Sequence, residues 1–457
     1  MHKSFIERRN VLFLVLILSH HCNESEVESL TPVNDGETVR YFITLKRKDY
    51  RCPYCSGRLY SHGYKDRFIR HPTLSEHKSV IVFHSRRYRC QDCRKTILEE
   101  NPFSFTGFRT SYSLQRNILL KLKNLNYTLQ MIADELNVSA TIVNLYLDSY
   151  VTVSEKPPLP EYMGIDELHS KVLSHRNSAY ICVIVDNEKR VLNNVLGSRS
   201  KNYLENYFYS YPVEERNKVK YVTIDMWKPY RDIVKKLFRN ARIAVDPFHV
   251  VEHLTSDFSK IRIALMKECV YESNAYYLLK NWHWLLETDD VDLDNEPQYN
   301  SRFHTKLNRR QLFEMTLSIS PKLKAAYFLK EEYRRFNRVM SYDEALENYD
   351  ALIRDFERED IKEYREFVSI LKNWREEILN SFLRPYDDRK LSNSLCENIN
   401  GKLRDYIDIS KGITNFVRFR KRVLYALNDD VFYSLTDVLR SDKREGRKRG
   451  KYEKTLP

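Results

Sequence analysis

Long apolar runs are missing from this sequence. The apolar segment VLFLVLIL at residues 11–18 is too short to span a bilayer, and the SHHC that follows it has no small-residue cleavage site. We therefore expect this segment to form a buried helix or strand rather than a signal peptide or a membrane anchor. The expected protein is cytoplasmic and has no membrane partner.

Cysteine is also scarce, and the distribution of the eight cysteines argues against a disulfide framework. Four of them form the pairs CPYC at 52–55 and CQDC at 90–93, while the others are scattered. Two such pairs at strand ends can hold structural Zn²⁺ in a zinc ribbon with a β-insert between them. Four unliganded core cysteines would have no reason to pair twice. The expected zinc ligands are Cys52, Cys55, Cys90 and Cys93.

Acidic residues do not balance the basic ones. Lys and Arg number 76 against 63 Asp and Glu, which gives a formal net charge of +13. Such a charge favours a polyanionic partner, because Lys and Arg neutralise phosphates and release counterions. We expect phosphate contacts from Arg418, Arg420, Lys421 and Arg422. The histidines between the cysteine pairs are expected at the surface or near DNA phosphates: His62, His71, His77 and His84.

The segment 127–151 has the pattern of a helix-turn-helix. Two apolar helical faces flank Asn137, which suits a left-handed turn, and Ser139 can cap the second helix. That helix would present Thr141 and Asn144 to a major groove. A helical hairpin in an ordinary core gives similar periodicity, so the motif gains weight from the cysteine pairs and the basic charge.

A change of pattern follows the proline-rich linker EKPPLPEY at 155–162. Three predicted strands, a helix, a strand, a helix and a strand succeed one another, which is the order of a ribonuclease-H-like fold. Residues 251–390 contain no glycine and have apolar residues at helical intervals, so they predict an all-helical insertion.

The expected fold is therefore a multidomain α/β protein with several modules. The 457-residue length predicts about three domains. The expected segments are an N-terminal segment at 1–44, a zinc ribbon at 45–105, a helix-turn-helix at 106–154, the first part of the core at 155–250, the insertion at 251–390, C-terminal core helices at 391–437 and a basic tail at 438–457.

Two aspartates end predicted strands that should be neighbours. Asp166 ends YMGID on the first strand and Asp225 ends YVTID on the fourth. Two carboxylates this close repel unless a cation lies between them, so we expect both to hold Mg²⁺ or Mn²⁺. A lone aspartate at a strand end is more often a cap or a turn former.

A third acid should come from a helix that packs across the sheet. In KLSNSLCENINGKLRDY, a narrow polar stripe lies opposite an apolar back formed by Leu391, Leu395 and Ile399. Glu397 on this stripe is the expected third ligand. The supporting residues on the same stripe are Asn393, Asn400 and Arg404. An ordinary amphipathic surface helix is the alternative interpretation.

These motifs resemble, as a set and in this order, the ISL3 family of bacterial insertion-sequence transposases. The resemblance covers about residues 45–435 and rests on GIDE, TIDMWKPY, VDPFHV and SNSLCENINGKLR behind CPYC, CQDC and the helix-turn-helix. It implies a DDE transposase with catalytic Asp166, Asp225 and Glu397. It also implies a supporting role for Asp246 and His249, with capping or core packing as an equal alternative.

The function expected is two-metal cleavage and transfer of DNA strands at terminal inverted repeats. Two ends must be held together, so the resemblance implies a homodimer or larger synaptic complex on double-stranded DNA, in a bacterial, nucleoid-associated protein. Two alternatives are a DNA-binding regulator whose core is inactive and a structure-specific nuclease. Acids at all three motif positions argue against an inactive core.

Overall fold

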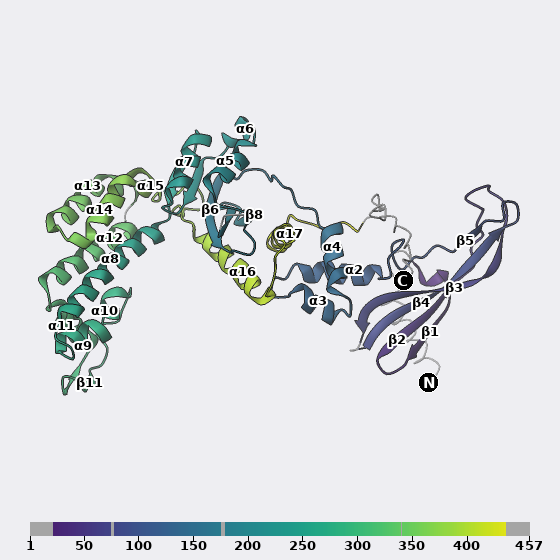
Figure 1. Ribbon diagram of the computed structural model, residues 1–457, viewed down its shortest axis with the longest axis horizontal. Coiled ribbons are helices and arrows are strands. Elements are labelled where there is room, and N and C mark those ends of the chain that lie inside the picture. Colours follow the sequence, from purple (N-terminus) through teal and green to yellow (C-terminus); the bar gives the residue numbers. More distant parts are fainter. Residues whose placement is uncertain (1–21, 75–76, 175–178, 340, 436–457) are drawn as a thin grey trace, which may run out of the picture. The chain divides into compact units, whose positions relative to one another are not determined.

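The computed structural model describes residues 22–74, 77–174, 179–339 and 341–435 (Figure 1). The apolar segment 11–18 and the basic tail 438–457 lie outside these residues, so the expectations for them stay predictions. The chain divides into two compact units, one within Met1–Ser154 and Tyr406–Pro457, the other within Glu155–Asp405. No helix of the described residues is long and apolar enough to cross a membrane.

A five-stranded sheet forms the N-terminal part of the first unit. A short 3-10 helix, η1 (Glu24–Glu26), precedes it. Its strands are β1 (Val27–Asn34), β2 (Thr38–Leu45), β3 (Leu59–Leu74), β4 (His77–Cys90) and β5 (Thr96–Leu98), in the order β1-β2-β4-β3 with β5 on β4. The β2–β4 pair is parallel and the other pairs are antiparallel.

The sheet begins well before the boundary expected at residue 45. Tyr41, Ile43 and Leu45 alternate inward from β2 and pack in one cluster with Ile81 and Phe83 of β4. The cysteine-bearing strands therefore share their core with β1 and β2, and the division of the chain differs from the expected one at this end.

Four helices form the rest of the first unit. They are α2 (Tyr112–Leu122), α3 (Leu129–Glu135), α4 (Ala140–Tyr150) and α17 (Phe416–Leu427). Asn137 has φ 52° and the Ser139 hydroxyl accepts from the Ile142 N–H, which confirms the turn and the cap expected from sequence. Tyr425 of α17 is buried among these helices and donates to the Leu119 carbonyl at 2.9 Å. The helix α17 thus packs here, not in the core where 391–437 was expected.

A second five-stranded sheet is the centre of the other unit. Its strands are β6 (Tyr162–His169), β7 (Tyr180–Asp186), β8 (Val191–Leu196), β9 (Tyr221–Ile224) and β10 (Arg242–Val245), in the order β10-β9-β6-β7-β8. The strands β6, β9 and β10 are parallel, and β7 is antiparallel to both of its neighbours. The connecting helices are α5 (Lys201–Tyr209), α6 (Val213–Arg216) and α7 (Lys228–Leu237).

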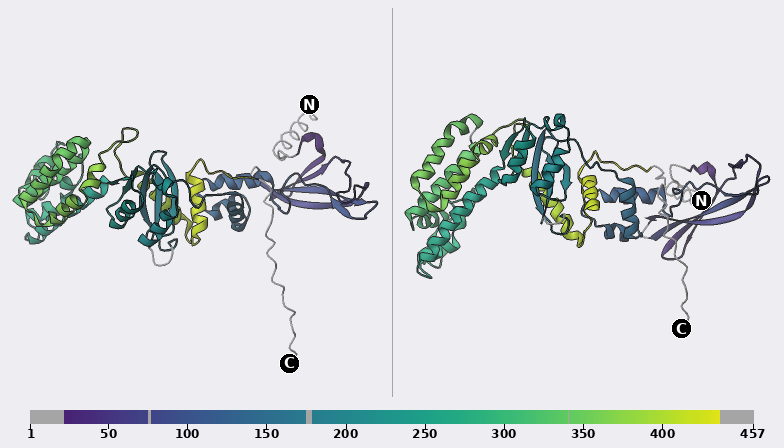
Figure 2. Two further views of the ribbon diagram at one scale, coloured as in Figure 1. Left: turned by 90° about the horizontal axis from the view of Figure 1, so that it is seen from above. Right: turned by 45° about the horizontal axis from the view of Figure 1, so that its top comes forward.

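The segment after β10 is largely helical, as its lack of glycine predicts. Figure 2 shows its helices gathered into one bundle. They are α8 (Pro247–Glu268), α9 (Asn274–Asn281), α10 (Trp284–Glu287), α11 (Arg309–Leu317), α12 (Pro321–Val339), α13 (Tyr342–Glu359), η2 (Lys362–Tyr364), α14 (Arg365–Asn373) and α15 (Arg375–Asn380). It is not all-helical, because β11 (Gln298–Asn300) and β12 (Thr305–Leu307) form a two-stranded ribbon.

The helix α16 (Ser394–Ser410) lies against the sheet of the second unit at its start. Asn393, just before it, is fully buried; its Nδ2 donates to the Ile165 carbonyl at 3.0 Å and its Oδ1 accepts from Thr223 Oγ1 at 3.1 Å. The buried side of α16 therefore includes the two asparagines of the predicted polar stripe, Asn393 and Asn400, as well as apolar Ile399. Hydrogen bonds with the sheet hold both amides, so this part of the stripe is a packing surface.

Gly164 allows this close approach of α16 to β6. A Cβ at Gly164 would lie 2.6 Å from Val185 Cγ2, 2.9 Å from Asn393 Oδ1 and 3.0 Å from Cys396 Sγ. We predict that Gly164→Ala lowers the free energy of unfolding of this unit by about 1–3 kcal/mol, because the core must move to admit the methyl group. Denaturant titration measures the change.

Gly401 provides a matched control within α16. A Cβ there has no atom within 4 Å, and alanine favours a helix by up to about 1 kcal/mol over glycine. Gly401→Ala should therefore leave stability unchanged or raise it. Equal effects of the two substitutions would contradict the close contact at Gly164.

Candidate active site

Three aspartates lie at one edge of the second sheet. Asp166 is on β6, Asp225 directly follows β9 and Asp246 directly follows β10. These strands are adjacent and parallel, with Gly164 paired to Thr223 and Ile224 paired to Val245. Continuing this register places the three carboxylates side by side. The strand β6 continues to His169, so the expected position of Asp166 at a strand end is wrong, whereas Asp225 and Asp246 directly follow their strands.

Asp166 is the most closely held of the three. It is 9% exposed, its Oδ1 accepts from the Glu167 N–H at 2.8 Å and its Oδ2 accepts from Asn400 Nδ2 at 2.9 Å. Burial raises the pKa of Asp166 to about 7; the hydrogen bond from the Glu167 N–H lowers this pKa, and the charges of Glu167 and Asp225 raise it. Asn400 therefore orients a carboxylate whose negative charge its surroundings compensate only in part.

Asp225 and Asp246 are held by backbone N–H groups. Asp225 Oδ1 accepts from the Trp227 N–H at 3.0 Å, and Asp246 caps α8 by accepting from the Phe248 N–H at 3.3 Å. Burial raises the pKa of both carboxyls, and Asp246 adds to the rise at Asp225. The expected capping alternative for Asp246 is thus realised by one oxygen, which leaves the other available.

The structure brings Glu397 closest to Asp246 and His249. Ligand atoms of these three residues lie within 4.8 Å of one another. Among the described residues, the predicted triad of Asp166, Asp225 and Glu397 does not reach that mutual distance. Burial raises the pKa of the Glu397 carboxyl, and Asp246 raises it further.

His249 connects the two groups of acids. Burial lowers its pKa, but Asp246, a hydrogen bond with Glu252 and the charges of Asp225 and Asp166 together raise it above its ordinary value. It therefore interacts with the aspartates at the strand ends as well as with Glu397. The five side chains form one continuous set: Asp166, Asp225, Asp246, His249 and Glu397.

Several buried oxygens around these acids have no hydrogen-bond partner in the described chain. They are Asp246 Oδ2, Glu167 Oε2 and Asn400 Oδ1. Each is an acceptor, and carboxylate and amide oxygens are the ligands that Mg²⁺ and Mn²⁺ prefer. The residues present therefore fit a divalent cation with its water shell.

Sequence patterns did not single out Glu167 and Arg199. Arg199 forms an ion pair with Glu167, and its guanidinium carbon lies 3.8 Å from the centre of the Tyr180 ring and 4.8 Å from that of Trp227. Arg199 also lowers the pKa of Asp225. The successive acids in GIDE were a signal for Glu167, whereas only the fold brings Arg199 to this edge. Predicted Arg404 is exposed, with no ion pair to these acids among the described residues.

The four paired cysteines of the first unit form a compact cluster. All four Sγ atoms lie within 4.8 Å of one another, with 3.6 Å between those of Cys52 and Cys93 and 3.4 Å between those of Cys55 and Cys90. Tetrahedral Zn²⁺ with bonds of about 2.3 Å needs sulfur separations of roughly this size. The thiolates thus fit a structural zinc ion.

The two cysteine pairs have the same local structure. The residue after each pair, Ser56 or Arg94, has φ 58°, and Lys95 Nζ of the second pair lies 4.0 Å from the centre of the Tyr54 ring of the first. A Cβ at Gly57 would lie 2.0 Å from Asp92 Oδ2, so this glycine permits the two turns to meet.

No histidine joins this cluster among the described residues. His71 is only 4% exposed, and its Nδ1 lies 3.0 Å from Ser111 Oγ, so the expected surface position of His71 is wrong. Its ring packs at the junction between the sheet and α2 instead.

The residues predicted to contact DNA have different environments. Thr141 is exposed on α4, and Asn144 is half-buried. Arg418 pairs with Asp148 at 2.8 Å, and Lys421 donates to the Asp148 carbonyl at 2.9 Å. Arg420 is half-buried on the same helix, whereas Arg422 is only 1% exposed.

Comparisons with known proteins match both regions. A transposase family model of the ISL3 type matches residues 163–423, more than half of the chain. A model of the zinc-finger of transposases IS204, IS1001, IS1096 and IS1165 matches residues 49–93, so the four cysteines belong to a zinc ribbon. The chain is 22% identical over 409 residues to the transposase for insertion sequence element IS1001 of Bordetella parapertussis, covering 88% of this chain and 92% of that protein.

The cysteine cluster predicts a defined loss of metal. Replacing Cys52 and Cys90 by serine should release about one zinc ion per chain and destabilise the first sheet, because thiolate ligands couple metal binding to folding. Elemental analysis of purified protein measures the zinc. Cys269→Ser, in the second unit, is the control and should retain it; a double variant that keeps its zinc would exclude this site.

The raised pKa of Asp166 predicts a pH dependence. Its pKa of about 7 in the folded state exceeds the ordinary 3.8, so the folded state binds the proton more tightly and stability falls as pH rises from about 4 to about 7. In metal-free protein, Asp166→Asn should flatten this fall and raise the free energy of unfolding at pH 7 by up to about 4 kcal/mol.

Urea titrations at several pH values measure this effect. The exposed Asp405→Asn variant of α16 should keep the wild-type profile. An unchanged fall of stability in Asp166→Asn would show that other groups take up the proton.

Proposed function

Because this chain belongs to the ISL3 family of transposases, we propose that it binds the terminal inverted repeats of an insertion sequence and catalyses cleavage and transfer of DNA strands. The observation that supports this proposal most directly is the row of three carboxylates on adjacent parallel strands, with Glu397 supplied by a helix packed on the same sheet. Phosphoryl transfer needs such a set of oxygen ligands and no covalent intermediate with the protein.

The strand order supports a ribonuclease-H-like core. In chain order the five strands lie as fifth, fourth, first, second and third across the sheet, with the first, fourth and fifth parallel. The helical insertion comes between the fifth strand and α16, which provides Glu397. Asp166 and Asp225 would thus precede the insertion in the chain and Glu397 would follow it. These acids meet only when the insertion folds so that α16 returns to the sheet.

We assign the catalytic acids to Asp166, Asp225 and Glu397, with Asp246 and His249 completing the metal ligands. Bound Mg²⁺ or Mn²⁺ would activate water or a 3′-hydroxyl and stabilise the departing oxygen. The contacts of Asp246 and His249 with Glu397 support a ligand role for them beyond orientation. Asn400 holds Asp166 in place, and the Trp227 N–H holds Asp225.

DNA recognition is assigned to the first unit. The turn at Asn137, the cap at Ser139 and the exposed Thr141 support a helix-turn-helix in which α4 enters the major groove. The zinc ribbon would add a second contact with the same DNA. Cleavage at two ends requires two active sites, so we propose a homodimer or larger complex on DNA.

Loss of one acid should separate cleavage from binding. We predict that Asp225→Asn lowers strand cleavage about 10³-fold or more while DNA binding is kept, because the acid acts on the reacting phosphate and not on recognition. The test uses purified protein, Mg²⁺ and a DNA fragment carrying the sequence that flanks the gene, with mapping of new 3′-hydroxyl ends.

Asp232→Asn is the matched control. Asp232 lies on α7 a few residues after Asp225 and pairs with Lys201 at the surface, so its loss should leave cleavage unchanged. Cleavage without joining in the wild-type protein would favour a nuclease, and binding without cleavage would favour a regulator. If Asp225→Asn instead abolishes binding, the residue is structural.

A further inference from the structure

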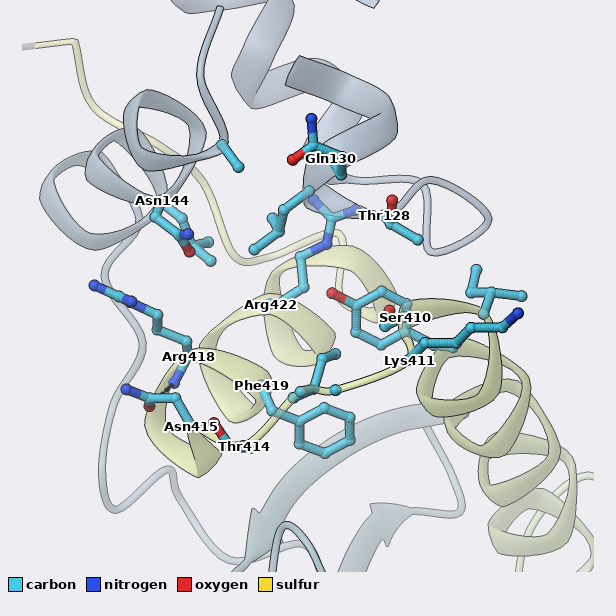
Figure 3. Close-up of a pocket in the computed structure, with 17 residues that line it drawn as sticks. Thr128, Gln130, Asn144, Ser410, Lys411, Thr414, Asn415, Arg418, Phe419 and Arg422 are labelled. Carbon is cyan, nitrogen blue, oxygen red and sulfur yellow. Dashed lines mark hydrogen bonds between the residues drawn. The ribbon is translucent and has the colours of Figure 1, made fainter. Parts of the chain in front are cut away.

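A pocket of about 470 Å³ lies within the first unit, between helices that are far apart in the sequence (Figure 3). The starts of α3 and α4 form one side, and the end of α16, the loop 411–415 and α17 form the other. Its volume is in the range of ordinary ligand sites.

Arg422 lines this pocket and is 1% exposed. Its Nη2 donates to the carbonyls of Asn124 at 2.9 Å and Tyr127 at 3.1 Å, and a hydrogen bond with Tyr406 raises its pKa, but Nε and Nη1 meet no carbonyl or carboxylate acceptor among the described residues. Burial lowers the pKa of Arg422 to about 10, so the guanidinium stays charged at neutral pH. A buried charge without a counter-ion is costly, which makes this arginine a strong candidate to hold an anion.

Other polar groups of the pocket also have no partner in the described chain. They are Ser410 Oγ, at the end of α16, and Asn144 Oδ1, on α4. The Ser410 hydroxyl can donate, and a half-turn of the Asn144 amide presents its NH₂ group. Figure 3 shows Arg422 between Asn144 and Ser410 in the view.

The charge of the lining is positive. Lys411, Arg418 and Arg422 line the pocket, and no acidic side chain of the described residues does. Asp148 pairs with Arg418 from outside the pocket, which leaves Lys411 and Arg422 to attract an anion.

We propose that this pocket binds a phosphate group, through the guanidinium of Arg422 and the hydroxyl of Ser410. The N–H groups of Arg422 on Nε and Nη1 point to different sides of the guanidinium, and Nη2 is taken by two carbonyls, so a phosphate oxygen would accept from one of these two groups. The site differs from the expected surface contacts of α17, because the residue that holds the phosphate is inside the protein. The phosphate can come from the DNA backbone beside α4 or from a free phosphate ion.

Isothermal titration calorimetry with inorganic phosphate, at constant ionic strength against chloride, tests the site in the full-length protein. Wild type should bind one phosphate saturably. Ser410→Ala should weaken binding on the order of tenfold, because a hydrogen bond to a charged group is lost. Ser410 makes no other side-chain hydrogen bond in the described chain, so this variant should fold normally.

Ser154→Ala, an exposed serine of the same unit, should bind phosphate as wild type does. Arg422→Met should abolish phosphate binding. If this variant fails to fold, the comparison of Ser410→Ala with wild type still tests the proposal. Equal phosphate and DNA affinities in wild type and both pocket variants would overturn the proposal.

Binding of the protein to the DNA fragment that carries the flanking sequence distinguishes a DNA-backbone phosphate from a free phosphate ion. If a backbone phosphate occupies the pocket, Ser410→Ala weakens DNA binding and added phosphate competes with DNA. If a free ion occupies it, Ser410→Ala loses phosphate affinity alone and both ligands bind together. Neither outcome depends on catalysis, because the Asp225→Asn variant should bind phosphate as wild type does.

Discussion

Burial of carboxylates side by side on three adjacent strands is the constraint on which the second unit depends. Parallel pairing of β6, β9 and β10 forces Asp166, Asp225 and Asp246 together, and burial raises the pKa of all three carboxyls. Backbone N–H groups and Asn400 compensate only part of this charge. The remaining deficit, with unpartnered oxygens on Asp246 and Asn400, is what a divalent cation would supply.

The position of α16 determines whether this edge can be completed. Asn393 bonds with both β6 and β9, and Gly164 leaves room for the helix, so Glu397 reaches Asp246 and His249. The same helix continues into the unit that contains α3, α4 and α17, since the division between the units falls at Asp405. The proposed active site and the proposed phosphate pocket therefore both include residues of α16.

The buried charges of the two units have opposite signs. The acid edge has several carboxylates and few cations, whereas the pocket has a buried arginine and no acid among its described lining residues. Both arrangements lower stability when empty, because buried charge prefers a partner. A ligand bound at either place would stabilise the fold, as zinc would at the four cysteines.

The sequence alone was sufficient for the local features. Spacing identified the four cysteines, the strand patterns predicted that Asp166 and Asp225 lie on neighbouring strands, and Asn137 and Ser139 marked the turn and cap of α4. Local pattern could not reveal partners distant in the chain. Only the tertiary structure decided that Glu397 meets Asp246 and His249, that Arg199 reaches Glu167, that Asn393 is buried, and that α17 packs beside α4 with Arg422 inside. These depend on long-range packing, and periodicity specifies which face of an element is apolar but not which element covers it.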